Sequence, residues 1–220
     1  MGQQTVIHDV SIALHPGMTQ WSGEAVYAET TMASTPNNHA NVTRLVLTTH
    51  TGTHVDPPRH FIHEGQTIDR VPLDRWIGPC YVADVRGAKP DIEVADLQRA
   101  AIPAGIERLV LKTDNSLLWS TATDRFVEDF VAVSPDAARW IVDRGIRLVG
   151  IDYLSVGSFR ETGVETHLIL LGNDVILVEG LNLSEIDAGH YELLCMPLKI
   201  RSGDGAPARV ALRGPLPAPE

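Results

Sequence analysis

Four of the nine histidines of this chain fall in one short run between His50 and His63. His50, His54 and Asp56 carry side chains that are preferred ligands of a borderline divalent metal. His60 follows at a spacing at which its imidazole could carry a proton instead of binding the ion. The run therefore predicts a metal-dependent enzyme, with His63 expected to be a solvated residue outside the site.

The backbone that carries these ligands is predicted to be extended and not helical. β-Branched threonines surround Gly52, and Pro57 and Pro58 follow, a composition that disfavours a helix. In an extended segment side chains alternate, so residues 50, 54 and 56 would project to one side of the chain. Gly52 would then leave that side open for a metal and a substrate.

A second pair of candidate ligands lies far along the chain. His167 falls in a helix predicted over 165–171, and Glu179 ends an apolar strand predicted over 175–179. A sharp return at residues 172–174 would bring the two side chains together. An acid that ends an apolar strand needs a partner, so Glu179 is the stronger candidate of the two.

The elements that must position these residues are short strands mixed with a few helices. Ser134 offers an N-cap and Gly145 a stop for one of the helices. Strands and helices do not alternate strictly, which favours a compact α/β domain with a mixed sheet over a doubly wound fold. The sequence contains no glycine-rich nucleotide-binding motif. The predicted strands cover 42–49, 80–85, 108–113, 147–152, 175–179, 191–200 and 208–212, with a turn at 202–205, and the predicted helices cover 94–101, 137–144 and 165–171.

Composition narrows the class of protein further. The 220 residues are 44% hydrophobic, which suits one domain, expected over 1–213 with a loose tail over 214–220. A net charge of −10 argues against nucleic acid or an anionic membrane as a partner. Cys80 and Cys195 lie in apolar runs and are expected to be buried, reduced thiols. Neither a signal peptide nor a membrane span is evident, so a cytoplasmic location is expected.

The histidine run resembles the signature of the metal-dependent cyclase-like hydrolases, a family that includes bacterial kynurenine formamidases and isatin hydrolases. The family pattern H-x-G-T/A-H-x-D-x-P-x-H is matched at every fixed position over residues 50–60. The segments MTQWSG at 18–23 and GDGAPAR at 203–209 are similar to the family as well. The resemblance implies a swivelling β/β/α fold that assembles as a homodimer or homotetramer.

The same resemblance implies a ligand set for one or two divalent ions. His50, His54 and Asp56 would bind the first ion, and Asp56 would bridge to a second ion completed by His167 and Glu179. Nitrogen and carboxylate ligands suit zinc, and the number of carboxylates also admits manganese.

The activity that the resemblance implies is hydrolysis of a small amide, foremost an N-formyl aryl amide such as N-formylkynurenine. A bound metal would lower the pKa of its water towards about 7 and so supply hydroxide. His60, which matches the family's catalytic histidine, would carry a proton to the leaving nitrogen. Trp21 matches an aromatic residue at the pocket mouth that contacts substrate, sometimes delivered by a neighbouring subunit.

Several alternatives stay open. Pro57 and Phe61 depart from the H-x-D-A-P-x-H-Y pattern of kynurenine formamidases, so a cyclic amide such as isatin, or another small amide or ester, is an alternative substrate. A Ser-His-Asp hydrolase is disfavoured because no G-x-S-x-G occurs. A non-catalytic binding protein with a structural metal would not need His60 unligated beside an open coordination position.

Overall fold

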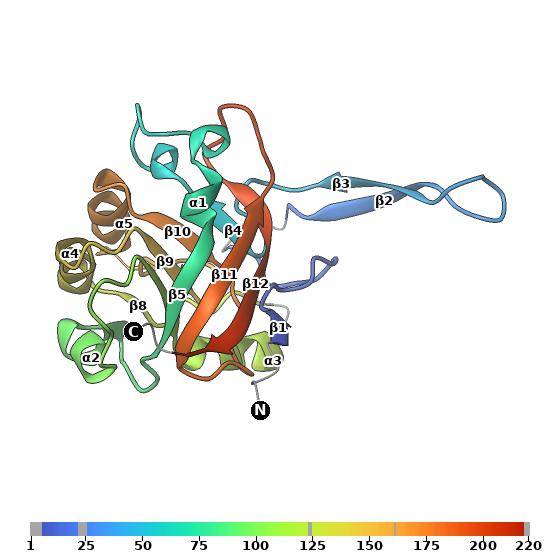
Figure 1. The fold of residues 1–220 in the computed structure, drawn as a ribbon. Coiled ribbons are helices and arrows are strands. Elements are labelled where there is room, and N and C mark those ends of the chain that lie inside the picture. The colour runs from blue at the N-terminus through green and yellow to red at the C-terminus, as the bar shows by residue number, and fades with distance from the viewer. Residues whose placement is uncertain (1–5, 22–25, 123–124, 161, 218–220) are drawn as a thin grey trace.

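The computed structural model describes residues 6–21, 26–122, 125–160 and 162–217, and its centre is a mixed β-sheet (Figure 1). The strands of this sheet are β1 (Val6–Asp9), β4 (His54–Asp56), β5 (Ile77–Asp84), β7 (Arg108–Lys112), β9 (Leu148–Ile151), β10 (Ile176–Glu179), β11 (Gly189–Pro197) and β12 (Ala206–Leu216). Their order is β1-β12-β11-β5-β7-β9-β10-β4, and β4 pairs back to β12. The sheet therefore closes into a barrel, which confirms the predicted α/β domain with a mixed sheet.

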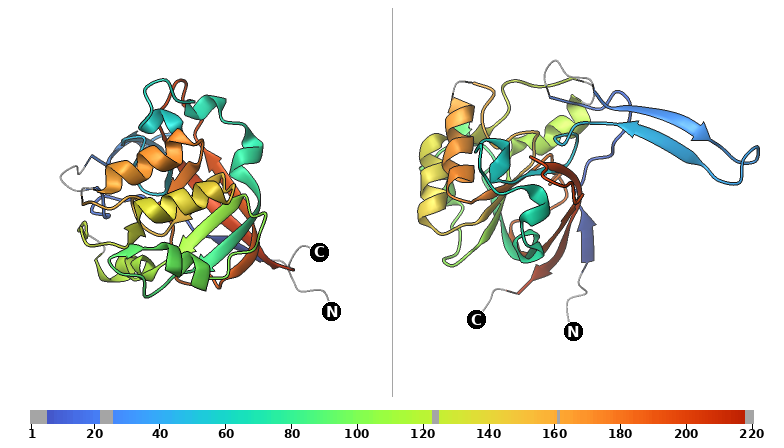
Figure 2. Two further views of the ribbon diagram at one scale, coloured as in Figure 1. Left: turned by 90° about the vertical axis from the view of Figure 1, so that its left-hand side faces the viewer. Right: turned by 90° about the horizontal axis from the view of Figure 1, so that it is seen from above.

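Helices and two small strand pairs complete the fold. The strand pairs are β2 (Ala28–Ala33) with β3 (Val42–Val46), and β6 (Asp91–Ile92) with β8 (Ala132–Val133). The α-helices are α1 (Leu73–Trp76), α2 (Val94–Arg99), α3 (Leu118–Thr121), α4 (Pro135–Asp143) and α5 (Thr162–Gly172), and the 3-10 turns are η1 (Pro58–His60), η2 (Ile68–Arg70) and η3 (Asp114–Leu117). Helices α4 and α5 lie side by side over one face of the sheet (Figure 2). No described helix has the length and apolar composition needed to cross a bilayer.

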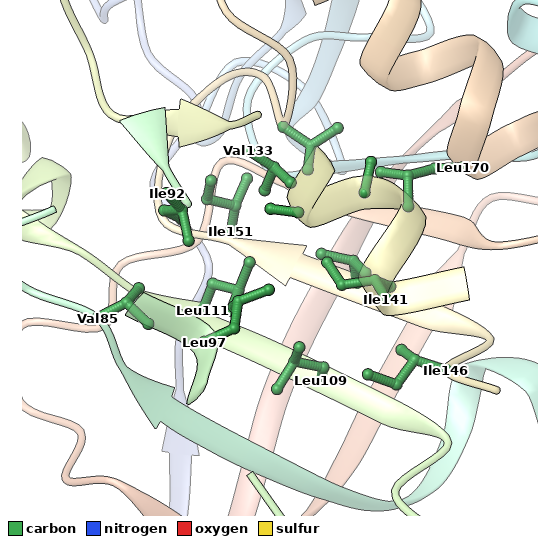
Figure 3. Close-up of a cluster of buried hydrophobic side chains, with 14 of the residues drawn as sticks. Val85, Ile92, Leu97, Leu109, Leu111, Val133, Ile141, Ile146, Ile151 and Leu170 are labelled. Carbon is green, nitrogen blue, oxygen red and sulfur yellow. The ribbon is translucent and has the colours of Figure 1, made fainter. Parts of the chain in front are cut away.

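Apolar side chains fill both sides of the barrel wall. Along β7, Val110 belongs to the cluster inside the barrel, whereas Leu109 and Leu111 belong to the cluster outside it. The outer cluster joins these strands to Leu97 of α2 and Ile141 of α4 (Figure 3). Strands that are buried on both faces read as continuous apolar runs, which explains why the sequence predicts them well. Burying one such leucine stabilises the fold by about 1.5–3 kcal/mol.

Most predicted elements are confirmed, with ends shifted by a few residues. The apolar runs appear as β5, β7, β9, β10, β11 and β12, and the three predicted helices appear as α2, α4 and α5. The Ser134 side chain accepts a hydrogen bond from the Ala137 N–H, and Gly145 takes the left-handed conformation that ends α4. Cys80 and Cys195 are buried free thiols inside the barrel, as expected.

Several predicted boundaries were wrong. The strand expected over 42–49 ends at Val46, because Val46 pairs with Ala28, the first residue of its partner β2. The helix expected from 165 begins at Thr162. The tail expected over 214–220 starts too early, because β12 continues to Leu216 and pairs there with β1 and β11. Residues 218–220, and Ser22 and Gly23 of the 18–23 motif, lie outside the described residues.

A long hairpin of β2 and β3, residues 28–46, projects from the body of the molecule (Figure 1). We call it the arm. Its side chains are almost all exposed, and they include the large apolar residues Met32, Val42, Leu45 and Val46. A two-stranded hairpin that packs against nothing is marginally stable in water. The arm thus has the apolar surface that a subunit contact would cover.

The predicted homodimer or homotetramer can be tested on the arm. Leu45 and Val46 are neighbours on β3 and therefore face opposite sides of the hairpin. Replacing both with serine should yield a monomer of 24.0 kDa by light scattering, with an unchanged circular dichroism spectrum. An assembly that stays intact in this variant would exclude the arm as the contact.

Candidate metal centre

Two neighbouring strands supply the centre of the site. In the antiparallel pair β4–β10, His54 lies directly opposite Glu179, so both side chains project to the same face. His54 Nε2 is 3.2 Å from Glu179 Oε2, and both residues are buried. The partner that an acid at the end of an apolar strand requires is therefore His54, from a segment far away in the sequence.

His167 joins this pair from helix α5. Its Nε2 lies 3.6 Å from Glu179 Oε1, so the return between α5 and β10 brings the two residues together as predicted. The same oxygen, Oε1, also accepts a hydrogen bond from the Val156 N–H at 2.7 Å. Glu179 is thus held between two imidazoles and one backbone donor.

His50 stands on a turn, which corrects the extended segment predicted for residues 50–56. Only His54–Asp56 forms a strand, and residues 49–53 form turns and bends. Gly52 has a φ of 70°, and a Cβ atom there would overlap the side chain of Leu14. The positive φ favours glycine at this turn, and Gly52 also lines the cavity beside the histidine cluster. The turn still delivers His50, whose Nδ1 lies 2.8 Å from Asp56 Oδ1.

Asp56 lies at the centre of the cluster and is fully buried. Among the described residues, neither carboxylate oxygen has a hydrogen-bond partner of acceptable geometry. His50 Nδ1 approaches Oδ1 at 2.8 Å, and the Nε2 atoms of His54 and His60 lie 3.8 Å from Oδ1 and Oδ2. A buried charge without hydrogen bonds is expected to be paired or to coordinate a metal. The donor atoms thus fit a divalent cation.

The ligand atoms form two groups that share Asp56. His50, Asp56 and His60 form one group, and His54, Asp56 and Glu179 form the other, with the atoms of each group within 4.8 Å of one another. The shared carboxylate suits the bridging role predicted for Asp56. The grouping differs from the prediction in placing His54 with Glu179 and away from His50. The assignment of each residue to a particular ion stays a prediction.

The orientation of the rings separates two of the predicted ligands from the predicted proton carrier. His54 donates from Nδ1 to the carbonyl of Gly52 at 2.8 Å, and His167 donates from Nδ1 to the carbonyl of Gly163 at 2.7 Å. A carbonyl only accepts, so each bond leaves Nε2 with a free lone pair, as is usual for metal-binding histidines. In the described part of the chain, no such bond holds the ring of His60.

The pKa shifts of Asp56 and His60 support the same roles, a charged ligand and a neutral proton carrier. Burial by itself would raise the pKa of Asp56, but the surrounding histidines lower it below its usual range, so the carboxylate stays charged. Burial lowers the pKa of His60 and outweighs the attraction of Asp56. His60 is therefore mostly neutral at pH 7 and can accept a proton.

The cluster opens into a cavity of about 630 Å³. Trp21 lines its mouth, as predicted, and its ring packs 4.8 Å from Phe126 and 5.6 Å from Phe159, measured between centroids. Phe159 and Asp204 also line the cavity, and neither was predicted as a site residue. Asp204 lies in the GDGAPAR segment that resembles the family, whereas no sequence pattern marks Phe159. The apolar part of the wall consists of Trp21, Val26, Phe61, Leu154, Phe159 and Val164.

Removing the charge of Asp56 tests the metal site directly. The variant Asp56→Asn keeps the shape of the side chain but leaves only one weaker ligand oxygen, so bound metal should fall to background by elemental analysis. Glu64→Gln is a matched control, because Glu64 directly follows the histidine run and its carboxylate is exposed to solvent. Retention of the full metal content by Asp56→Asn would contradict the proposed centre.

Solved structures with similar folds include two described as a potential and a predicted metal-dependent hydrolase, and isatin hydrolases. A structure described as a potential metal-dependent hydrolase with cyclase activity superposes with a TM-score of 0.83 at 33% identity, over 97% of this chain and 100% of that one. An isatin hydrolase bound to the product analogue thioisatinate superposes with a TM-score of 0.81, over 96% of this chain and 93% of that one. Its identity is 22%, so this second likeness concerns the fold alone.

Sequence comparisons identify the family. A kynurenine formamidase of Salinibacter ruber is 35% identical over 207 residues, covering 93% of this chain and 96% of the relative. The cyclase-like protein 3 of Oryza sativa subsp. japonica is 40% identical over 184 residues, covering 80% of this chain and 66% of the relative. The family model described as "Putative cyclase" matches residues 8–158. The chain therefore belongs to the cyclase family.

Proposed function

We propose that this protein is a metal-dependent amidohydrolase that acts on a small N-formyl aryl amide such as N-formylkynurenine. The observation that carries the proposal is Asp56, a buried carboxylate that two sets of ligand atoms share and that has no hydrogen-bond partner of acceptable geometry among the described residues. These sets open into a cavity with an aromatic wall. Relatives named kynurenine formamidase, 32–35% identical over most of the chain, support the amide as the reacting bond.

The residues that would hold the metal are His50, His54, Asp56, His167 and Glu179. Bound there, one or two divalent ions would supply Lewis acidity, which acidifies water and polarises an amide carbonyl. The mixture of imidazole and carboxylate ligands suits zinc and admits manganese. The two backbone carbonyls that orient His54 and His167 would keep Nε2 of each ring directed at the ion.

His60 is the residue placed to move the proton. Its Nε2 lies 3.8 Å from Asp56 Oδ2, beside the ligand atoms, and its side chain is partly exposed to the cavity. A neutral imidazole accepts a proton from the attacking water. It then donates that proton to the amide nitrogen as the carbon–nitrogen bond breaks. The products are a carboxylic acid, formic acid in the case of a formamide, and a free amine.

The apolar wall would bind the aryl part of the substrate. Trp21 and Phe159 present their rings at the cavity mouth, each a little over one-third exposed. An aromatic ring that stacks there gains about 0.5–1.5 kcal/mol beyond the burial of its surface. The polar end of the substrate then faces His60 and the ligand cluster.

A cyclic amide such as isatin is the alternative substrate. Phe61 lines the cavity and stacks on His167 with ring centroids 4.4 Å apart and an interplanar angle of 11°. The kynurenine formamidase pattern has tyrosine at this position, so Phe61 leaves the wall beside the cluster without a hydroxyl group. A compact, fused ring would fit this apolar surface.

The role of His60 predicts that binding and turnover can be separated. His60→Ala should keep the metal content but lower kcat by about 10²–10⁴-fold, the usual contribution of a general acid–base. His63→Ala is the control, because that imidazole is exposed to solvent in the same run. Loss of metal from His60→Ala would instead make His60 a ligand, as its group with His50 and Asp56 allows.

The aromatic wall predicts a preference for aryl amides. Trp21→Ala should raise KM for an aryl formamide by roughly tenfold, equivalent to about 1.4 kcal/mol. Turnover of N-methylformamide, which has no ring to stack, should be unaffected. Equal losses for both substrates would remove Trp21 from the binding site.

A screen of the metal-loaded protein decides between the substrates. N-formylkynurenine, isatin and simple lactams would be offered to the same preparation, with product formation followed by chromatography. We expect N-formylkynurenine to be hydrolysed with the highest kcat/KM. Hydrolysis of isatin alone would replace the lead substrate and leave the amidohydrolase proposal in place.

A further inference from the structure

His50 is held by a different kind of partner from the other two histidines proposed as ligands. The rings of His54 and His167 are oriented by backbone carbonyls of their own segments. His50 lies on a turn, and its Nε2 is 3.2 Å from the Oδ2 atom of Asp204, a residue of the loop between β11 and β12. The other ring nitrogen of His50, Nδ1, lies 2.8 Å from Oδ1 of Asp56.

Asp204 is itself fixed in place from both sides. Its Oδ1 accepts a hydrogen bond from the Thr49 hydroxyl at 3.2 Å, next to His50 in the chain. The loop that carries Asp204 is tied to turn η2. The Ser202 N–H donates to the Asp69 carboxylate at 3.0 Å, and the Ile68 N–H donates to the carbonyl of Gly203 at 3.0 Å. The carboxylate of Asp204 is therefore a positioned acceptor even though it is half-exposed.

Gly205, the residue after Asp204, packs directly against the imidazole ring of His50. A Cβ atom built on Gly205 would lie 2.6 Å from Cε1 of His50 and 3.0 Å from the carbonyl oxygen of Val55. Any side chain at this position would displace the ring. The imidazole of His50 is thus packed against bare backbone at Gly205 and hydrogen-bonded by the residue that precedes it.

We propose that Asp204 is a positioning residue that selects Nδ1 of His50 as the atom presented to the metal. Asp204 makes a hydrogen bond to Nε2, and a carboxylate only accepts, so the proton of the neutral ring lies on Nε2. Asp56 Oδ1 is closer to Nδ1, at 2.8 Å, but among the described residues Nδ1 has no hydrogen-bond partner of acceptable geometry, which leaves its lone pair for a metal on the Asp56 side of the cluster. His54 and His167 do the reverse and present Nε2. The inference rests on the metal centre proposed above.

The first test measures metal affinity and not turnover. A carboxylate that orients a metal-binding histidine typically contributes 10–100-fold to affinity. Asp204→Ala should therefore weaken Zn²⁺ binding by about 10–100-fold in a competition with a chromogenic chelator. Asp204→Asn should restore most of the affinity, because its amide oxygen still accepts from Nε2.

A matched control separates positioning from the integrity of the loop. Asp69→Ala removes the anchor of Ser202 in the same loop but does not touch His50. We expect this variant to bind Zn²⁺ as the unsubstituted protein does. Equal losses in Asp69→Ala and Asp204→Ala would mean that Asp204 acts only through loop structure, which would overturn the inference.

The tautomer supplies a second readout. In the zinc-loaded protein, nitrogen-15 NMR should show His50 protonated on Nε2, and His54 and His167 protonated on Nδ1. Protonation of His50 on Nδ1 would overturn the assignment, as would unchanged affinity in Asp204→Ala.

If the unsubstituted protein bound no divalent ion, the metal centre itself would be wrong and the inference would fall with it. Binding in the unsubstituted protein with no effect of Asp204→Ala would refute the inference alone.

Discussion

The burial of the Asp56 carboxylate is the constraint on which the rest of the site depends. A charged group that is fully buried without a hydrogen bond is costly by several kcal/mol, and the chain surrounds it with imidazoles from three separate local structures. His50 comes from a turn, His54 from a strand and His60 from a 3-10 turn. A cation between these groups would supply the ligand bonds that the Asp56 oxygens lack among the described residues.

Closure of the barrel is what brings the partners of Asp56 together. Strand β4 has only three residues, yet it pairs with β10 on one side and with β12 on the other. The first pairing sets Glu179 opposite His54, and the second brings the loop before β12 to the turn that holds His50. Residues near positions 50, 179 and 204 therefore form one site because a short strand fills the gap in a closed sheet.

The cavity combines the two kinds of residue that hydrolysis of an aryl amide would use. The cavity lining includes His50, His54 and Glu179 of the ligand cluster, and it also includes the aromatic residues Trp21, Phe61 and Phe159. His60 lines the same cavity near the ligand atoms, but in the described structure it lacks the kind of hydrogen bond that orients His54 and His167. Its freedom suits proton transfer, which requires a ring that can exchange partners.

Local sequence was enough to locate the chemistry and most of the strands. The histidine run carries its ligands close together, and strands buried on both faces leave continuous apolar runs that can be read without a structure. The return between α5 and β10 also followed from local turn signals, which is why Glu179 and His167 could be paired in advance.

Long-range pairing could not be predicted from the sequence in this way. Leu14 packs against Gly52 from a distant segment, the partner of Glu179 depends on the register of β4, and the position of the His50 ring depends on a loop about 150 residues later in the chain. These contacts arise only when the barrel closes, because no local propensity encodes which distant strand fills the last position in a sheet.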